Sequence, residues 1–177
     1  DKAVKRGGFT INAVCSDALF YDDYCRWNPR TKAVHLSNAK RNTKEMLKIL
    51  RKQRIDMIVS VQHPWVLERS VIEAVDGYAL NLHNAQLPKY KGYNSISHAI
   101  INEDSVYTTS LHWIIEQVDA GDICLTREVP ISKWDDARSL YLKTLGEVEA
   151  ILSHLSGMLS DGSEVPSVKI SGSGAFY

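Results

Sequence analysis

Hydrophobic and polar positions alternate strictly in the middle of the chain, over residues 78–83. Leu80 and Leu82 fall on one side of this alternation, whereas Asn81 and His83 fall on the other. A period of two is typical of a β-strand, in which successive side chains point to opposite faces. Two residues of strand rise about 6.7 Å, so the amide and the imidazole can converge on one small ligand.

The rest of the chain combines short apolar runs, which predict strands, with segments of helical period, which predict helices. We predict strands at residues 9–16, 31–36, 56–61, 78–83, 107–115 and 123–131. We predict helices at residues 17–28, 66–75 and 95–102, and two more that begin after residue 42 and after residue 135 or 136. Strands that alternate with helices imply an α/β fold with a mostly parallel sheet.

Two of the predicted helices have capping residues at their start. Asn42 is an N-cap candidate with Glu45 at the third helical position, a variant of the capping box. Asp135 or Asp136 is the candidate cap of the last helix, whose apolar residues recur with helical period. We expect this last helix to pack across the sheet.

The composition is typical of a single globular domain. The chain has 177 residues, of which 44% are hydrophobic and 24% are charged. Lys plus Arg and Asp plus Glu both total 21, and this zero net charge argues against nucleic acid as a partner. Three cysteines without metal-ligand spacing predict a reduced, cytoplasmic protein. No apolar run has the length of a membrane span, so we expect no membrane partner.

Two segments carry the most specific pattern. Residues 81–92 read Asn-Leu-His-Asn-Ala-Gln-Leu-Pro-Lys-Tyr-Lys-Gly, and residues 118–123 read Val-Asp-Ala-Gly-Asp-Ile. They resemble the folate-dependent formyltransferases, whose pattern is Asn-x-His-x-Ser-x-Leu-Pro-x-Tyr-Arg/Lys-Gly followed by a distant Asp-x-Gly turn. The resemblance runs from residue 56 to residue 159 and looks closest to enzymes that formylate amino sugars carried on a nucleotide.

The resemblance implies a Rossmann-like, open, mostly parallel sheet flanked by helices. It also implies transfer of a formyl group from 10-formyltetrahydrofolate to a nucleotide-linked amino sugar. The acceptor it points to is a dTDP-4-amino-4,6-dideoxyhexose used in surface polysaccharide (lipopolysaccharide O-antigen) synthesis. Relatives begin with an apolar strand and helix before residue 9, so we expect residues 1–177 to be a single catalytic domain that is incomplete at both ends.

An amide and an imidazole on one strand face, with a carboxylate to orient the base, suit reactions that pass through a tetrahedral oxyanion. The resemblance assigns these roles to Asn81, His83 and Asp119. Asn81 would donate to the formyl oxygen, and His83 would move the proton from the amine to the leaving nitrogen. Asp119 would hold the productive tautomer of His83 or position a water molecule. The competing interpretations are a structural histidine, a strand-edge amide and an ordinary turn aspartate.

The resemblance implies one set of binding residues, and the chemistry of the side chains suggests a second. The folate would contact the loop after the strand at residues 56–61 and two later positions, namely Gln62, His63, Pro64, Trp65, Leu87 and Val118. The pyrophosphate and sugar would contact Lys89, Tyr90, Lys91 and Asn94, of which the two lysines supply positive charge. We predict no metal site, because the six histidines lack partners at ligand spacing.

Other functions remain open at this point. A phosphoribosylglycinamide formyltransferase would share the same site residues, and a non-catalytic folate- or sugar-nucleotide-binding module is a further alternative. Zero net charge disfavours a transfer-RNA acceptor. The aromatic tract of Tyr21, Tyr24, Arg26 and Trp27 is compatible with stacking on a nucleotide base, with packing, or with the surface of a homodimer.

Overall fold

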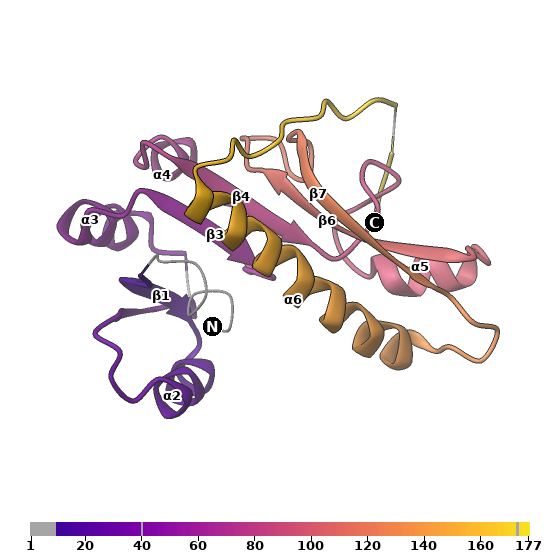
Figure 1. The fold of residues 1–177 in the computed structure, drawn as a ribbon, viewed down its shortest axis with the longest axis horizontal. Coiled ribbons are helices and arrows are strands. Elements are labelled where there is room, and N and C mark those ends of the chain that lie inside the picture. The colour runs from indigo at the N-terminus through magenta and orange to yellow at the C-terminus, as the bar shows by residue number, and fades with distance from the viewer. Residues whose placement is uncertain (1–9, 40, 173) are drawn as a thin grey trace. The chain divides into compact units, whose positions relative to one another are not determined.

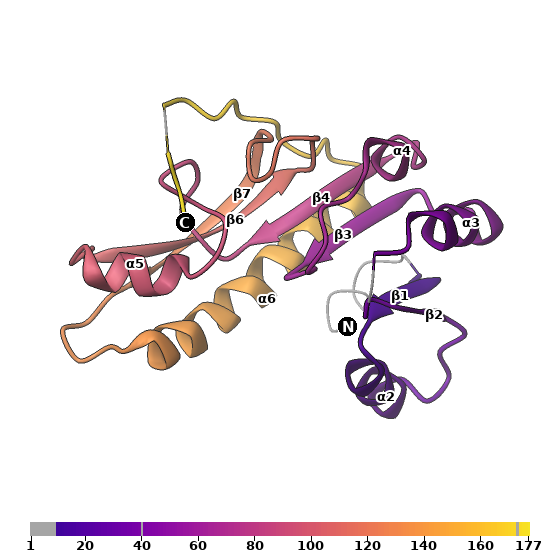
Figure 2. The same cartoon turned by 180° about the vertical axis from the view of Figure 1, so that it is seen from behind.

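The computed structural model describes residues 10–39, 41–172 and 174–177. The polar opening of the chain and Phe9 of the first predicted strand lie outside these residues. Two compact units make up the described chain, Thr10–Ala79 and Leu80–Tyr177, and Figures 1 and 2 show them from opposite sides. No helix among the described residues is long and apolar enough to cross a membrane.

The N-terminal unit opens with a parallel pair of strands. Strand β1 (Ala13–Ser16) pairs in register with β2 (Val34–Ser37), and helix α2 (Ala18–Trp27) connects them. The side chain of Asp17 caps α2 by accepting a hydrogen bond from the Phe20 N–H at 2.8 Å. The predicted helix and both predicted strands are therefore present, although β1 begins later than expected.

The second half of this unit follows the predicted order of helix, strand and helix. Helix α3 (Thr43–Gln53) begins at its predicted cap, where the Asn42 side chain accepts from the backbone N–H of the third helical residue at 3.3 Å. Strand β3 (Met57–Val61) comes next. Helix α4 (Arg69–Ile72) is a single turn within the predicted segment.

The sheet of the C-terminal unit positions the candidate site. Strand β4 (Tyr78–His83), β6 (Val106–Trp113) and β7 (Ile123–Pro130) pair in this order, and both pairings are antiparallel. All three strands lie where the sequence predicts them. Pairing is thus parallel between β1 and β2 and antiparallel from β4 to β7, within an α/β fold.

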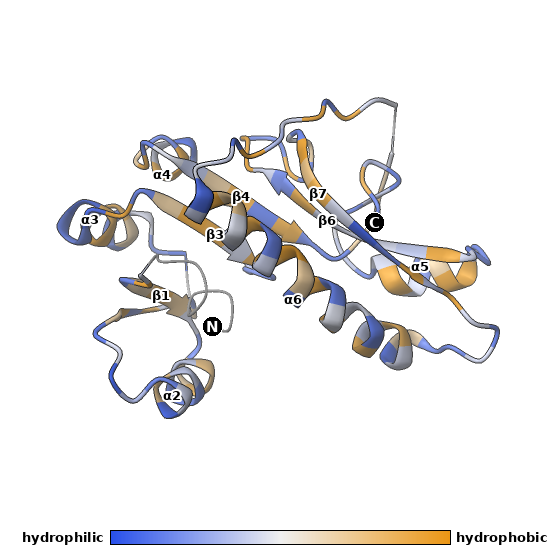
Figure 3. Ribbon diagram, in the orientation of Figure 1, coloured by the Kyte–Doolittle hydropathy of each residue, from blue (hydrophilic) through white to orange (hydrophobic). Residues whose placement is uncertain are grey.

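Two helices complete the C-terminal unit, α5 (Ser95–Ile101) and α6 (Ala137–Asp161). Helix α6 begins with a capping box between Asp136 and Ser139, which confirms one of the two predicted caps. It packs against β6, β7 and α5, and Figure 3 shows apolar and polar residues alternating along it. The buried cluster of this unit comprises Ala85, Tyr90, Ala99, Tyr107, Val129 and Leu140.

A second, very short strand pair was not predicted. Strand β5 (Tyr90–Lys91) pairs in parallel with β8 (Ala175–Phe176), so the segment before Tyr177 lies beside the loop that follows β4. Strands of two residues carry no periodic signal in the sequence.

Candidate active site

Strand β4 presents Asn81 and His83 on one face, as its alternation predicts. Leu80 and Leu82 on the other face are 0% and 2% exposed and anchor the strand in the core. The side chain of His83 keeps 12% exposure, so the imidazole is mostly buried yet still reaches solvent. Packing of the leucines therefore fixes the direction in which the amide and the imidazole point.

Strand β6 adds a second imidazole, which the sequence did not point to. Its antiparallel register places His112 directly opposite Asn81. The Nε2 atom of His112 lies 3.1 Å from the amide nitrogen of Asn81, and its Nδ1 lies 2.8 Å from the carbonyl oxygen of Trp113. Since a carbonyl only accepts, Nδ1 donates to it, and Nε2 is the atom that accepts from the Asn81 amide. The sequence predicted that His112 lies within a strand, but not that the register of β6 on β4 places it opposite Asn81.

The carboxylate of Asp119 comes from the loop between β6 and β7. Its backbone is left-handed, with φ of 49°, and its Oδ2 accepts from the Gly92 N–H at 3.0 Å. The same oxygen lies 3.8 Å from His83 Nδ1, and Oδ1 lies 3.5 Å from His112 Nε2. The structure thus brings together the three residues that the sequence proposed, with His112 as a fourth member.

Sterics explain why the Asp-x-Gly turn has a glycine at position 121. A Cβ added at Gly121 would collide with the backbone carbonyl of Trp113, which lies at the end of β6. Glycine therefore allows this loop to pack against the end of the strand. The packed loop places Asp119 beside the two histidines.

A backbone carbonyl sets the tautomer of His83. Its Nε2 lies 2.9 Å from the carbonyl oxygen of Tyr90, so Nε2 carries the proton and donates to that oxygen. The basic nitrogen of the neutral ring is therefore Nδ1, the atom that faces Asp119 at 3.8 Å. At this separation the carboxylate acts on the imidazole through its charge rather than through a direct hydrogen bond.

Burial and charge act against each other at this pair. Burial is the largest influence on His83 and lowers its pKa, and His112 lowers it further; the Asp119 charge and the Tyr90 carbonyl raise the pKa without outweighing burial. Burial raises the pKa of Asp119, but the proximity of His112 and His83 and the hydrogen bond from the Gly92 N–H together bring it below the ordinary value. His83 is consequently a neutral base at neutral pH beside an ionised carboxylate.

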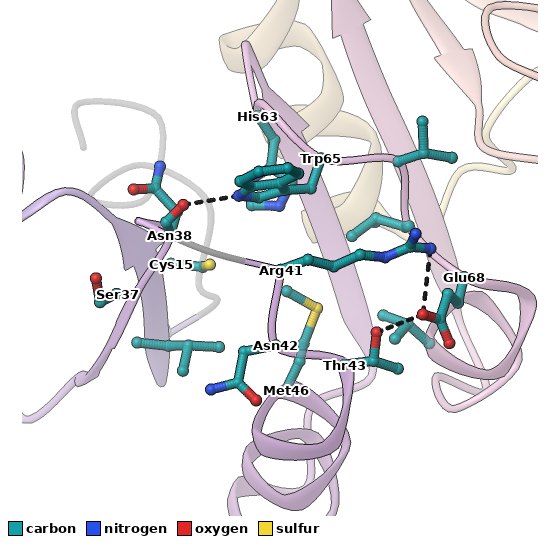
Figure 4. A pocket seen from close by; sticks show the side chains of 14 residues that line it. Cys15, Ser37, Asn38, Arg41, Asn42, Thr43, Met46, His63, Trp65 and Glu68 are labelled. Carbon is teal, nitrogen blue, oxygen red and sulfur yellow. Dashed lines mark hydrogen bonds and ion pairs between the residues drawn. The ribbon is translucent and has the colours of Figure 1, made fainter.

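The predicted folate loop lies in the N-terminal unit. His63 and Trp65 line a pocket there, shown in Figure 4, together with residues from the ends of β1 and β2 and the start of α3. The indole N–H of Trp65 donates to the Asn38 carbonyl at 2.7 Å. Across the pocket, Arg41 pairs with Glu68 at 3.2 Å. Gln62, next to this pocket lining, has a positive φ of 50°.

The remaining predicted folate contacts have different exposures. Pro64 is exposed, as is Val118, which comes directly before Asp119 and is 37% exposed. Leu87 is half-buried in the loop after β4. Val118 adjoins the candidate site through Asp119. The surroundings of Pro64 and Leu87 do not assign either residue to a ligand.

The four predicted substrate residues divide into two groups. Lys91 is half-buried and Asn94 is exposed, and both are available to a ligand. The ammonium of Lys89 instead lies 2.7 Å from both carboxylate oxygens of Asp104. The ring of Tyr90 is 1% exposed.

The prediction that the Tyr90 side chain binds substrate is therefore corrected. Its hydroxyl donates to Asp104 at 2.7 Å and accepts from Asn102 at 2.9 Å, and its ring belongs to the hydrophobic core. An aromatic residue between two lysines resembled a binding tract, but burial of the ring removes it from any ligand. Its backbone carbonyl, which holds His83, is the part that serves the site.

The aromatic tract of α2 is split in the same way. Tyr21 stacks on His35 with ring centroids 4.2 Å apart, and its hydroxyl donates to the Ala33 carbonyl at 2.6 Å. Tyr24 contacts Thr31, whereas Trp27 is 77% exposed. The two tyrosines are packing residues. Among the described residues, no group of three or more His, Cys, Asp or Glu side chains is arranged to hold a metal ion.

Sequence comparison identifies one family. A family model described as formyl transferase matches residues 22–155. A methionyl-tRNA formyltransferase from Fusobacterium nucleatum is 36% identical over 117 residues, which cover 65% of this chain and 37% of that protein. The chain spans about a third of the length of the curated relatives that it matches.

Solved structures of low identity share the fold. Phosphoribosylglycinamide formyltransferase from Bacillus halodurans aligns with a TM-score of 0.74 at 19% identity, over 92% of this chain and 90% of its own. The formyltransferase PseJ from Anoxybacillus kamchatkensis aligns with a TM-score of 0.71 at 20% identity, over 92% and 83%. That structure is a complex with UDP-4,6-dideoxy-4-formamido-L-AltNAc and tetrahydrofolate. The predicted α/β formyltransferase fold is confirmed.

Proposed function

Because the chain belongs to the formyl transferase family, we propose that it transfers a formyl group from 10-formyltetrahydrofolate to the amine of a nucleotide-linked amino sugar. The observation that carries this proposal is the convergence of Asn81, His83 and Asp119, with His83 Nδ1 at 3.8 Å from the carboxylate. An oxyanion donor, a neutral base and a fixed negative charge are the groups that acyl transfer to an amine requires.

The proposed reaction needs no covalent enzyme intermediate. The amine nitrogen attacks the formyl carbon, a new C–N bond forms, and the bond between that carbon and N10 of the folate breaks. His83 Nδ1 takes the proton that the amine loses and returns it to N10, while the charge of Asp119 stabilises the imidazolium between these steps. Orientation of the two reactants by the site can supply about 7–11 kcal/mol.

Asn81 stabilises the developing oxyanion in this scheme. Its amide has two N–H groups, one of which donates to His112 and so fixes the plane of the amide. The second N–H is then directed to the formyl oxygen. His112 is thus a positioning residue for Asn81, a role that its 3% exposure and its hydrogen bond to the Trp113 carbonyl support.

The substrates are assigned by resemblance and chemistry together. The folate is proposed to contact the loop Gln62–Trp65, Leu87 and Val118, and the sugar nucleotide Lys91 and Asn94. The PseJ complex, which contains a formamido sugar on UDP together with tetrahydrofolate, supports this substrate class. A dTDP-4-amino-4,6-dideoxyhexose in surface polysaccharide synthesis is the acceptor we propose. A single catalytic domain, a cytoplasmic location and a homodimer through the exposed residues of α2 remain predictions.

Two observations favour other acceptors. Similarity to phosphoribosylglycinamide formyltransferase and to methionyl-tRNA formyltransferase makes the ribonucleotide and the aminoacylated RNA the acceptors to exclude. All three reactions place an amine before the same formyl carbon. The catalytic trio is therefore common to them, and only the acceptor pocket distinguishes them.

The test is mass spectrometry after incubation of the full-length protein with 10-formyltetrahydrofolate and one acceptor at a time. We expect the formyl mass on the amino sugar nucleotide, and product formation about 10²- to 10³-fold slower with Asn81→Ala. Formylation of glycinamide ribonucleotide or of methionyl-tRNA alone would replace the proposed acceptor. If no acceptor is formylated and calorimetry shows ligand binding, the protein is a binding module and the proposal fails.

A further inference from the structure

Strand β5 has two hydrogen-bonding edges with different partners. The Tyr90 carbonyl accepts from His83 at 2.9 Å, and the Gly92 N–H donates to Asp119 at 3.0 Å. These two groups lie on one edge of residues 90–92, where Gly92 follows β5 with a φ of 84°, and the Lys91 carbonyl between them points to the other edge. Both titratable residues of the proposed mechanism are therefore held by one short stretch of main chain.

The opposite edge of the same stretch is bonded to the segment Gly174–Tyr177. The Lys89 carbonyl accepts from Ala175 at 3.2 Å, and the Lys91 carbonyl accepts from Tyr177 at 3.0 Å. The Tyr93 N–H donates to the Tyr177 carbonyl at 3.0 Å. Backbone bonds of Tyr177 thus hold the residues on both sides of the glycine that binds Asp119.

Side-chain packing reinforces this backbone pairing. The ring of Tyr177 stacks on His98 with centroids 3.8 Å apart and an interplanar angle of 27°, and it lies 5.8 Å from the ring of Tyr90. A Cβ at Gly174 would collide with the carbonyl of Pro88, and a Cβ at Gly92 would collide with the carbonyl of Tyr177. The two segments approach as closely as their backbones allow.

We propose that the segment Gly174–Tyr177 positions His83 and Asp119 for catalysis by fixing β5 from its other edge. It touches no reacting atom, so its residues are positioning residues for the proposed reaction, on which this inference rests. Because β5 is hydrogen-bonded along both edges, its backbone is fixed relative to His83 and Asp119. Without β8, the loop from Lys89 to Tyr93 keeps its hydrogen bonds to His83 and Asp119 but loses the backbone pairing that fixes the position of the loop. A misplacement of about 1 Å in such a site can cost up to about 100-fold in rate.

A matched pair of glycine substitutions tests the proposal. Gly174→Ala adds a methyl group against the Pro88 carbonyl, whereas Gly146→Ala adds one on the exposed face of α6, with nothing within 4 Å. In the full-length protein we expect kcat to fall about 10- to 100-fold for Gly174→Ala, with the folate KM changed less than kcat. Gly146→Ala keeps the kcat of the wild type.

Titration of His83 gives a readout that does not depend on turnover. Burial lowers the pKa of this imidazole, and Asp119 and His112 are the titratable groups that face it. Loosening β5 exposes the ring, so in NMR titration of the ring protons the pKa should rise toward its ordinary value in Gly174→Ala but not in Gly146→Ala. A general loss of stability without displacement of the loop would leave this pKa unchanged.

Substitutions of Tyr177 separate stacking from the strand itself. Tyr177→Phe keeps the ring over His98 and should retain wild-type kcat, whereas Tyr177→Leu should show a smaller loss of kcat than Gly174→Ala. Equal kcat and equal His83 pKa in the Gly174 and Gly146 variants would overturn the positioning role. Absence of formylation by the wild type, with the pKa difference present, would overturn the proposed function and leave the positioning role standing.

Discussion

Two buried polar clusters lie next to each other at the end of β4, and they differ in how completely their hydrogen bonds are satisfied. The Asn84 side chain donates to Thr144 at 2.8 Å and accepts from Thr109 at 2.6 Å. One residue earlier, His83 lies 3.8 Å from Asp119. The first cluster is closed on itself, whereas the second leaves an imidazole and a carboxylate close but unbonded. A closed cluster serves stability, and an open one can move a proton.

The closed cluster ties three elements together. Helix α6 contributes Thr144, strand β6 contributes Thr109 and Tyr107, and helix α5 contributes Ser95. The Tyr107 hydroxyl donates to the Asn84 carbonyl and also contacts the Ser95 hydroxyl at 3.0 Å, and burial raises the pKa of Tyr107 to about 12. These hydrogen bonds hold the loop after β4 against α5, α6 and β6.

The largest expected effect follows from removing Asn81, the proposed oxyanion donor on the same face of β4 as His83. Asn81→Ala should lower kcat about 10²- to 10³-fold, the usual consequence of losing one such donor. The unfolding free energy should change by about 0.5–1.5 kcal/mol, the net value of the hydrogen bond to His112. Steady-state kinetics and urea unfolding measure the two quantities. A large loss of stability with little loss of kcat would place Asn81 among the structural residues.

The opposite pattern, a large loss of stability with little loss of kcat, is expected for Asn84, the residue after His83. Asn84→Ala leaves the hydroxyls of Thr109 and Thr144 without their amide partner, at a cost of about 2–3 kcal/mol in unfolding free energy. The folded fraction should keep most of its kcat. Gln86→Ala, at an exposed position of the same loop, is the control and should unfold like the wild type. If Asn84→Ala unfolded at the wild-type urea concentration, the closed cluster would not be a stabilising one.

The same contrast explains what the sequence could predict. Period-two alternation predicted that Asn81 and His83 share one face of β4, since Leu80 and Leu82 on the other face are buried. The capping side chain of Asn42 was readable, since a helix start depends on residues a few positions apart. Local patterns of this kind need no knowledge of the tertiary structure.

What the sequence could not predict depends on contacts between distant segments. His112 joins the site through the antiparallel register of β6 on β4, and no local pattern fixes a register. The pairing of β5 with β8 joins residues more than eighty positions apart. Tyr90 was misassigned for a related reason: only the folded core shows that its ring is buried and its hydroxyl satisfied.

Whether a lysine already has a partner in the structure also predicts which of the two binds the phosphates of the proposed sugar nucleotide. No partner is recorded for the Lys91 ammonium among the residues that the structure describes, whereas Lys89 is bonded to Asp104. Lys91→Met should raise the KM of the sugar nucleotide about tenfold, the loss of roughly one charge-assisted hydrogen bond. Lys89→Met, the matched variant, should leave this KM unchanged. A larger KM increase for Lys89→Met would mean that the ion pair opens when substrate binds.

The smallest expected effect is a displacement of the pH profile. The acid limb of kcat/KM reports the pKa of the free base, and activity falls as pH decreases through that pKa because the neutral imidazole is lost. The Asp119 charge raises the pKa of His83 against the larger, opposite effect of burial. Asp119→Asn removes that charge, so the pKa of His83 falls and the acid limb moves to lower pH, whatever happens to the maximal rate. The control is Asp122→Asn in the same turn, where the carboxylate accepts from Ser167 at 2.8 Å and should leave the limb in place. A limb that moved to higher pH, or that moved equally in both variants, would mean that the carboxylate of Asp119, 3.8 Å away, does not set the pKa of His83.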